Sequence, residues 1–268
     1  MASLHKMLPS LTQTAVLHAT GARLSLPQVV RQAGIFQSSS PSYLLMASMD
    51  GCIRLLEEQG EELFAAWKAR LDKFDRLASG LKHLRLLGHG AEAGASYPGI
   101  FALDPAKILI STRNSALTGV ELKNRLREEY KIELEMALDH YAVAMTGLGT
   151  DDTMPTRLAE ALLALDEAAG PNEEPPAEPL PAYELPPRRM SLEEAAMAPG
   201  GLTFLYDGIG KVCGEYIWAY PPGIPLVTPG EEITANLVET VETLYRSGVR
   251  LLGTRGKPPF TTFAVADE

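Results

Sequence analysis

A lysine framed by serine and histidine stands near the beginning of the sequence, in the segment Ser3-Leu4-His5-Lys6. A lysine amine that is buried loses proton affinity and becomes a nucleophile toward an aldehyde, with which it forms a Schiff base. Neighbouring hydrogen-bond donors, here Ser3 and His5, would suit a phosphate carried by the same ligand. The alternative is a solvated charge, and this segment alone does not separate the two.

A run of serines, Ser38-Ser39-Ser40-Pro41-Ser42, precedes an apolar stretch. Ser40 is a good helix N-cap and Pro41 fits the first helical position, so a helix is predicted to begin there. The free N–H groups and partial positive charge of a helix N-terminus also suit a phosphate. Capping needs only one serine, so Ser40 and Ser42 remain candidates for both roles.

Other polar and aromatic residues are expected to be structural. Glu133 and Glu135 lie two apart in a predicted strand and share a face, where surface charges are expected rather than catalytic carboxylates. His89 stands between glycines and is expected to be a solvated loop residue, with substrate contact as the alternative. Three aromatic residues alternate along another predicted strand and are expected to pack: Tyr216, Trp218 and Tyr220.

The composition excludes several classes of protein. The chain has 268 residues, of which 46% are hydrophobic and 22% charged, enough to bury a core. Its net charge of -10 disfavours a nucleic-acid or membrane-surface role. The sequence has two cysteines, Cys52 and Cys213, which form no disulfide or zinc motif and fit a reducing cytoplasm. Its five histidines are scattered and form no metal-binding motif. No apolar run approaches the roughly 20 residues of a membrane span, and no signal peptide is expected.

The elements that must position these residues follow a mixed α/β order. A short strand is predicted at 15–19 and a connection without regular structure at 23–37. A long amphipathic helix is predicted from Gly60, because apolar residues recur there every three or four positions. Thr118 and Glu121 have the spacing of a capping box at the start of a further helix. The remaining elements are strands at 84–89, 107–112, 131–137 and 141–147, and helices at 118–130 and 153–170.

The second half of the chain is divided by prolines. Residues 171–187 hold seven prolines and predict a linker with little regular structure. A helix is expected to begin in 191–201, and a last amphipathic helix lies within 233–253. The turn at 221–225, Pro-Pro-Gly-Ile-Pro, is interpreted as structural.

Three stretches resemble the pyridoxal-phosphate-dependent decarboxylases of ornithine, lysine and arginine, a fold-type-I group related to aspartate aminotransferase. The first is the Ser-x-His-Lys motif with the Leu-Pro-x-Leu-Thr-Gln stretch that follows it at 8–13, and the second is Ser-Pro-Ser-Tyr-Leu-Leu-Met-Ala-Ser at 40–48. The third is Gly-Lys-Val-Cys-Gly-Glu-Tyr-Ile-Trp-Ala-Tyr-Pro-Pro-Gly-Ile-Pro from 210, leading to Pro-Gly-Glu. The order of the stretches matches that of the family and covers nearly the whole chain.

The resemblance implies an α/β fold and a cofactor site. The chain would be the C-terminal portion of a fold-type-I enzyme, with its major-domain part at 1–168, an α/β subdomain at about 36–168, a linker at 169–190 and a small α+β domain at 191–268. Lys6 would be the catalytic residue that holds pyridoxal 5'-phosphate, and Ser3 and His5 would contact its phosphate or ring. Ser40 and Ser42 would lie near a dimer interface, where such a segment can help complete the partner's cofactor site.

The family places its motif lysine after a long N-terminal half, which carries the partner of the pyridine nitrogen and the group that stacks on the ring. The resemblance therefore implies a truncated or split decarboxylase that acts on a basic amino acid, arginine, lysine or ornithine, in polyamine or diamine metabolism in the cytoplasm. It would be a homodimer or associate with a chain that supplies the N-terminal half. By itself it is expected to bind the cofactor weakly and to show no decarboxylation. The alternatives are a non-catalytic partner of a full-length or complementary decarboxylase chain, or an unrelated α/β binding protein.

Overall fold

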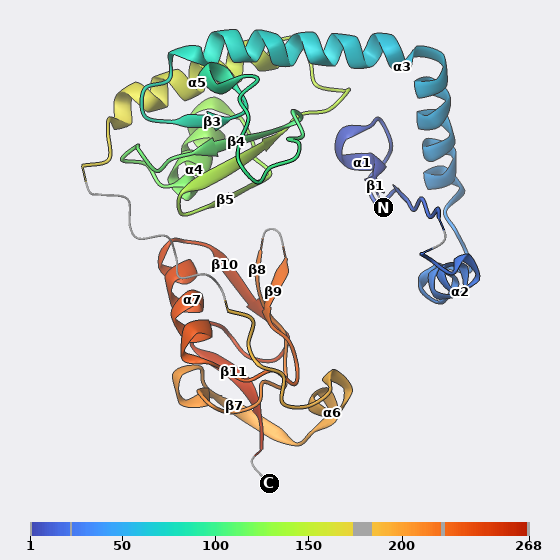
Figure 1. The fold of residues 1–268 in the computed structure, drawn as a ribbon, viewed down its shortest axis with the longest axis vertical. Helices are drawn as coiled ribbons and strands as arrows, with labels where there is room; N and C mark the ends of the chain where they lie inside the picture. Colours follow the sequence, from blue (N-terminus) through green and yellow to red (C-terminus); the bar gives the residue numbers. More distant parts are fainter. Residues whose placement is uncertain (1, 22, 174–183, 221–222, 267–268) are drawn as a thin grey trace.

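The computed structural model describes residues 2–21, 23–173, 184–220 and 223–266 (Figure 1). Within these ranges the buried apolar side chains gather in two clusters. The central cluster extends from Trp67 to Leu165, and the C-terminal cluster extends from Leu205 to Ala264. Both clusters combine helices with strands, so the mixed α/β class expected from the sequence is confirmed.

A four-stranded antiparallel sheet, in the order β3-β4-β6-β5, carries one side of the central cluster. Its register pairs Leu86 with Ile110 and Ile108 with Ala144, and all four side chains are buried. Their neighbours along the strands are half-buried or exposed, so one face of the sheet carries this core. The strands are β3 (Arg85–Leu87), β4 (Lys107–Ser111), β5 (Met136–Leu138) and β6 (Tyr141–Met145).

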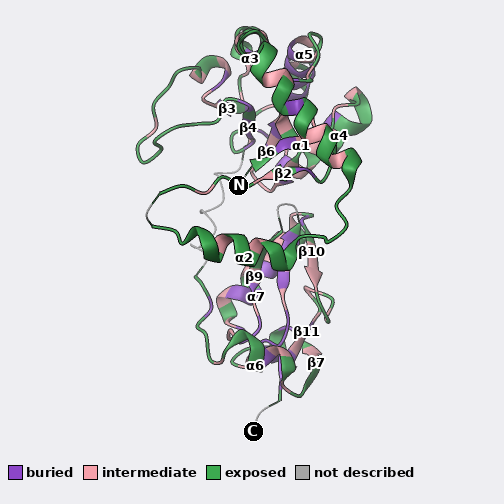
Figure 2. Cartoon of the chain, turned by 90° about the vertical axis from the view of Figure 1, so that its right-hand side faces the viewer, coloured by how far each residue is buried: buried purple, intermediate pink, exposed green. Residues whose placement is uncertain are grey.

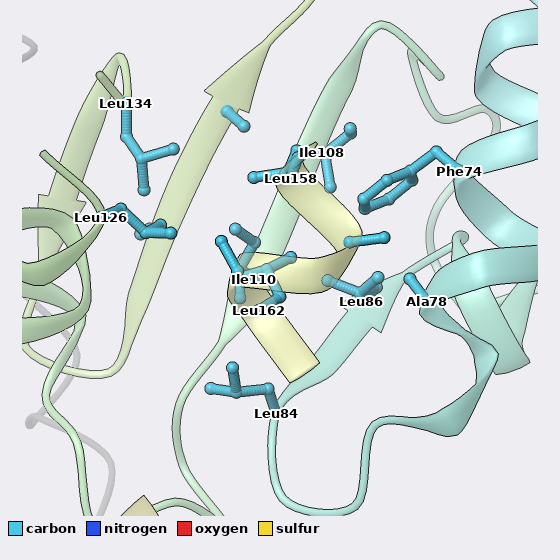
Figure 3. Close-up of a cluster of buried hydrophobic side chains, with 14 of the residues drawn as sticks. Phe74, Ala78, Leu84, Leu86, Ile108, Ile110, Leu126, Leu134, Leu158 and Leu162 are labelled. Carbon is cyan, nitrogen blue, oxygen red and sulfur yellow. The ribbon is translucent and has the colours of Figure 1, made fainter. Parts of the chain in front are cut away.

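Three helices cover that face of the sheet: α3 (Tyr43–Leu77), α4 (Gly119–Tyr130) and α5 (Met154–Ala169). Figure 3 shows Phe74 of α3 and Leu162 of α5 among the sheet side chains. Both are fully buried, and burial of side chains of this size contributes about 1.5 to 3 kcal/mol each. The amphipathic pattern predicted from Gly60 onward therefore does become the core-facing side of a helix.

Local sequence signals set the ends of two of these helices. The hydroxyl of Thr118 accepts from the N–H of Glu121 at 3.1 Å, and the Glu121 carboxylate accepts from the N–H of Thr118 at 2.8 Å. This is the predicted capping box. The helix predicted to end near Gly170 ends at Ala169, with Gly170 at a positive φ of 73° as its C-cap.

The helix expected from Ser40 begins later than predicted. Its N-cap is Ser42, whose hydroxyl accepts from the N–H of Leu45 at 3.4 Å, and the first helical residue is Tyr43. The same helix continues through Gly60 to Leu77, so the two predicted helical segments are one element that bends in Figure 1. The apolar contacts of its second half outweigh the low helix propensity of glycine.

The interpretation of residues 23–37 as a connection is wrong, because α2 (Leu26–Phe36) lies there. Ser25 takes the N-cap position and Pro27 lies in the first turn, a favourable place for proline. No residue of α2 is buried, and Figure 2 shows the helix as mostly exposed. The apolar side of α2 has no core to face within the described chain.

The C-terminal cluster is built on two small antiparallel sheets, β10-β8-β9 and β11-β7. Side chains of α7 close it, with Leu237 and Val241 fully buried. The elements are α6 (Leu192–Met197), β7 (Gly200–Phe204), β8 (Ile217–Tyr220), β9 (Ile224–Val227), α7 (Ala235–Arg246), β10 (Arg250–Gly253) and β11 (Thr261–Val265).

The expectation that the alternating aromatic residues pack is wrong in its choice of face. Ile217 and Ala219 form the buried side of β8, whereas Trp218 is half-buried and Tyr220 is 51% exposed. Alternation in a strand predicts two faces but not which one is buried.

Several predictions fall on undescribed residues. Of the expected linker at 171–187, residues 174–183 lie outside the described ranges, as do Pro221 and Pro222 of the expected turn. The domain limits near 169–190 therefore stay a prediction. In the part of the chain that is described, no helix combines the length and apolar character needed to cross a bilayer.

Candidate functional site

The lysine motif lies on a one-turn helix, α1 (Leu4–Met7), flanked by the strand pair β1 (Ala2–Ser3) and β2 (Ala15–Val16). Leu4 is its buried anchor, and its N–H donates to the carbonyl of Thr14 at 3.1 Å. A helix of four residues is not stable by itself, so this packing and the loop below must hold it.

A loop between β6 and α5 receives the end of α1. The N–H of Leu148 donates to the carbonyl of Met7 at 3.0 Å, and a Cβ added to Gly147 would lie only 2.7 Å from that carbonyl oxygen. Glycine is therefore required for the close approach of the two backbones.

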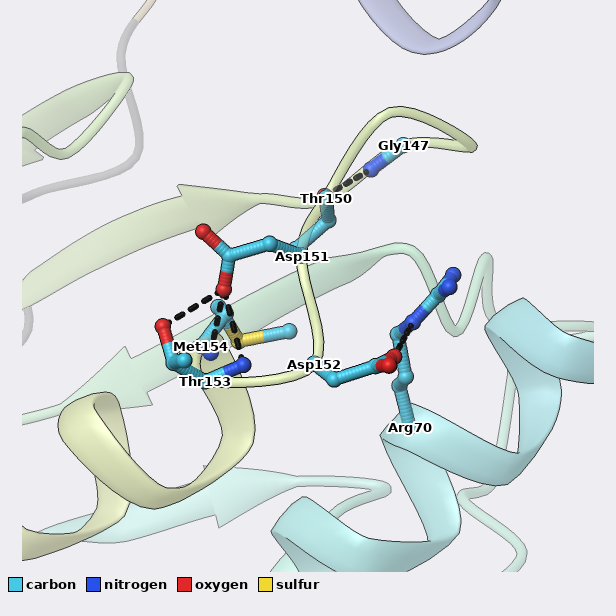
Figure 4. Close-up of polar contacts among 7 residues, drawn as sticks. All are labelled: Arg70, Gly147, Thr150, Asp151, Asp152, Thr153 and Met154. Carbon is cyan, nitrogen blue, oxygen red and sulfur yellow. Dashed lines mark hydrogen bonds and ion pairs between the residues drawn. The ribbon is translucent and has the colours of Figure 1, made fainter.

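Polar contacts fix the shape of this loop (Figure 4). The hydroxyl of Thr150 accepts from the N–H of Gly147 at 2.9 Å, and Asp151 accepts from the N–H groups of Thr153 and Met154 at the start of α5. The Thr153 hydroxyl and these N–H groups lower the pKa of Asp151. The loop that holds α1 is thus itself tied to α5.

The side chain of Lys6 forms an ion pair with Glu135. Its Nζ lies 2.5 Å from Oε1 of Glu135, and the two side chains are 47% and 36% exposed. An amine that burial activates for Schiff-base formation lies in an apolar pocket, whereas the Lys6 amine lies at the surface against a carboxylate. Lys6 is accessible, but the described residues do not enclose it.

The other two residues of the motif differ in their surroundings. Nδ1 of His5 lies 2.8 Å from the carbonyl oxygen of Thr14, so this nitrogen carries the hydrogen and Nε2 is free to accept. Ser3 is exposed and stands at the N-cap of α1 without a side-chain cap bond. Ser3, His5 and Lys6 thus remain close together at one surface edge.

The structure gives the two candidate serines of the second motif roles at the start of α3. Ser42 caps the helix, and Ser40 donates its N–H to the hydroxyl of Ser38 at 3.1 Å. Both are exposed, and neither has a described bond to the Lys6 motif. Ser48 instead bonds the stretch that follows the motif, because its hydroxyl accepts from the N–H of Leu11 at 2.7 Å and bonds the Ser10 hydroxyl at 3.2 Å.

Glu135 is a neighbour of Lys6 that the sequence did not predict. Glu133 and Glu135 were expected to share one strand face, but β5 begins only at Met136. Glu133 pairs instead with Lys123 and Arg127, at 3.6 and 3.2 Å, so the two carboxylates serve different partners. Both do lie at the surface, as expected, and only the fold reveals that one of them reaches the motif lysine.

These residues alone do not fit pyridoxal phosphate. The exposed Lys6 amine could reach an aldehyde, and the Ser3 hydroxyl could donate to a phosphate, whereas the Nδ1 hydrogen of His5 is already given to Thr14. However, Lys6 is paired with Glu135 and its side chain is 47% exposed, and Ser40 and Ser42 make their contacts elsewhere. Orientation and exclusion of water would have to come from groups outside this set.

The expectation that His89 is solvated is wrong. Its side chain is only 3% exposed, and Nδ1 lies 2.8 Å from Oδ1 of Asp75. The ring also meets Phe74 edge to face, with centroids 6.1 Å apart. The flanking glycines, Gly88 and Gly90, have φ values of 72° and 58°, and these turns direct the histidine inward.

Comparison with known proteins relates the chain to amino acid decarboxylases. No family model matches it. It is 29% identical to an arginine decarboxylase of Halalkalibacterium halodurans over 256 residues, covering 94% of this chain and 51% of that protein. An arginine decarboxylase of Bacillus subtilis is 28% identical over 258 residues, again covering 94% of this chain and 51% of that protein.

A solved structure agrees with these relatives in fold. The constitutive lysine decarboxylase of E. coli superimposes with a TM-score of 0.74 at 18% identity, over 98% of this chain and 49% of that chain. The chain therefore has a mixed α/β fold like part of a lysine decarboxylase, and the sequence matches support a decarboxylase-like family. It spans about half the length of the curated relatives it matches.

Proposed function

We propose that this chain provides the lysine-bearing portion of a fold-type-I, pyridoxal-phosphate-dependent decarboxylase of a basic amino acid. Arginine, lysine or ornithine would be the substrate, in cytoplasmic polyamine or diamine metabolism. The observation that carries the proposal is the surface edge where His5 and Lys6 of α1 lie beside Ser3, the N-cap of that helix. The relatives named arginine decarboxylase support it, because they align with 94% of this chain.

The chemistry that we propose needs groups beyond the described residues. Pyridoxal phosphate, when bound, supplies the electron sink for loss of carbon dioxide. This chain would supply the amine of Lys6 and hydrogen-bonding groups of Ser3 and His5, while a second copy or a complementary chain would cover the ring. Lys6 would first have to leave Glu135, which it contacts at 2.5 Å.

Exposed apolar side chains support association with such a chain. Val30 and Phe36 of α2 are 70% and 86% exposed, and Tyr43 and Leu44 at the start of α3 are 82% and 71% exposed. Apolar patches of this kind mark interaction surfaces or cause aggregation. The proposed assembly is a homodimer or a complex with a chain that carries the N-terminal half.

The Lys6–Glu135 ion pair also favours a second candidate function. The ion pair gives the Lys6 side chain a structural contact that involves no cofactor. The chain could therefore act as a structural or regulatory partner of a decarboxylase. The two functions differ in whether Lys6 ever forms a covalent bond with the cofactor.

Borohydride trapping separates the two functions. The chain is incubated with pyridoxal phosphate, reduced and digested, and the labelled lysine is identified by peptide mass spectrometry. The isolated chain should show weak, substoichiometric label on Lys6, rising toward one label per chain when the remaining portion of a relative is added. Label confined to other lysines in the mixture would contradict the assignment of Lys6.

A matched control is available in Lys82. This lysine also forms an ion pair at 2.5 Å, with Glu167, and its side chain is 60% exposed. Lys82→Ala should leave the trapped label unchanged, whereas Lys6→Ala should remove the specific part of it. Equal losses in the two variants would show that trapping reports only exposed amines and would favour the non-catalytic role.

A further inference from the structure

A cavity of about 340 Å³ lies between α3 and the loops that flank β3 and β4. Phe64 and Trp67 of α3 form an aromatic wall, with ring centroids 6.0 Å apart and ring planes inclined by 29°. The indole N–H of Trp67 donates to the hydroxyl of Thr146 at 2.9 Å, which fixes the ring. This wall is an ordered apolar surface of the kind that binds small molecules.

A buried histidine faces the same cavity. Asp75 accepts from Nδ1 of His89 at 2.8 Å and from the N–H of Gly90 at 3.0 Å. An ionised carboxylate only accepts, so Nδ1 carries the hydrogen, and in the neutral ring Nε2 is left as an acceptor. Among the residues described, no hydrogen bond to this Nε2 is found, and Nε2 is not one of the fully buried atoms that lack a partner, so solvent or a small ligand can reach it.

The charges around the cavity favour a cation. Three carboxylates line it, those of Asp72, Asp75 and Asp104, against one ammonium, that of Lys68. Lys68 is engaged by Asp72 at 2.7 Å. Asp104 contacts Lys107 at 2.5 Å, and among the described residues Asp75 accepts from the His89 ring and from the N–H of Gly90 but from no lysine or arginine. An anionic ligand would meet these carboxylates, and a fully apolar ligand would leave Nε2 of His89 unpaired.

We propose that this cavity binds a small organic cation, an alkyl amine or alkyl guanidine. Its N–H groups would donate to Nε2 of His89, the carboxylate of Asp75 would supply the opposite charge together with that of Asp104, which the ligand would share with Lys107, and its alkyl part would pack on Phe64 and Trp67. Neither Lys6 nor Glu135 lines this cavity. The site is therefore additional to the proposed function and does not depend on a cofactor.

Tryptophan fluorescence tests the proposal directly. The chain has two tryptophans, so in a Trp218→Phe background Trp67 alone reports. Pentylamine should give a saturable change at micromolar to millimolar concentration, the range open to so small a ligand. Pentanol and pentanoate, which have the same chain length, should bind at least about tenfold more weakly. Absence of a saturable change, or equal binding of the three probes, would overturn the proposal.

Two variants test the binding groups. His89→Phe keeps a ring beside Phe74 but removes Nε2, and Asp104→Asn removes one charge while an oxygen remains for the N–H of Ala106. Each should weaken pentylamine at least about fivefold, a loss typical of one polar contact. Thermal unfolding shows whether each variant is folded. If His89→Phe does not fold, the pentylamine affinity of Asp104→Asn alone tests the site.

The control for these variants is Glu129→Gln, which also removes one carboxylate charge. Glu129 forms an exposed ion pair with Arg125 on α4 and does not line the cavity. It should bind pentylamine as the parent does. Unchanged affinity in the folded cavity variants, or an equal loss in Glu129→Gln, would overturn the site.

Discussion

Nζ of Lys6 lies 2.5 Å from Oε1 of Glu135, although 129 positions separate the two residues. The contact is possible because α1 docks on the loop after β6, next to the segment that leads into β5. Both side chains remain more than a third exposed, so the pair is worth at most about 1 kcal/mol. A ligand that offers Lys6 a better partner can therefore displace Glu135.

Glu135→Gln should release the Lys6 amine. Removal of a competing interaction of up to about 1 kcal/mol predicts a rise of about two- to fivefold in the rate at which borohydride traps pyridoxal phosphate on Lys6. Glu133→Gln is the matched control, because Glu133 pairs with Lys123 and Arg127 rather than with Lys6. A rate that is unchanged in Glu135→Gln would show that the ion pair does not limit access to the amine.

Gly147→Ala should loosen α1. The added Cβ would lie 2.7 Å from the carbonyl oxygen of Met7, so α1 or the loop must move, at an expected cost of about 1 to 3 kcal/mol in unfolding free energy. Gly149→Ala is the control in the same loop, since a Cβ there has no atom within 4 Å. Denaturant unfolding measures both, and equal effects would mean that the contact with α1 is not the cause.

Asp166→Asn should destabilise the central cluster. This carboxylate is 2% exposed and accepts from the N–H groups of Lys82, His83 and Leu84, at 2.6, 3.0 and 2.6 Å. Loss of a charged acceptor that serves a buried turn predicts about 2 to 3 kcal/mol less free energy of unfolding. Glu167→Gln, at an exposed neighbour, should stay within about 0.5 kcal/mol. Similar unfolding curves for both variants would contradict this role of Asp166.

Cys213 should add a pH dependence to stability. Its side chain is buried, and burial raises the pKa of the thiol from 9.0 to about 11. The folded state therefore holds the thiol proton more tightly than the unfolded state. The contribution of the protonated thiol to the free energy of unfolding is full below pH 9 and is lost as the pH rises through about 11. The stability advantage of the parent over Cys213→Ala should shrink by about 1 to 2 kcal/mol across that window. Urea unfolding at several pH values measures it, and a constant difference would refute the prediction.

Local sequence signals predicted much of the central fold. The capping box at Thr118, the helix end at Gly170 and the apolar spacing around Phe74 each depend on residues within a few positions of one another. Short-range hydrogen bonds and side-chain periodicity decide such features. The same reasoning failed for α2, whose apolar side has no described core to face.

The site residues depend on contacts between distant segments, which the sequence alone does not specify. Glu135 meets Lys6, and Asp75 meets His89, only because the loops after β6 and β3 turn toward α1 and α3. The glycines around His89 were visible in the sequence, but their positive φ values and the burial of the histidine were not. The grouping of Ser3, His5 and Lys6 followed simply from their adjacency, and their chemical roles stay predictions.

The central proposal is that Lys6 acts in decarboxylation when the rest of the site is supplied. The most direct measurement is release of carbon dioxide from arginine, lysine and ornithine by this chain mixed with pyridoxal phosphate and the remaining portion of the Bacillus subtilis relative. We expect no release from either part alone, release from the mixture, and loss of that release in Lys6→Ala but not in Lys82→Ala. Release by the isolated chain, or release from the mixture that survives Lys6→Ala, would contradict it.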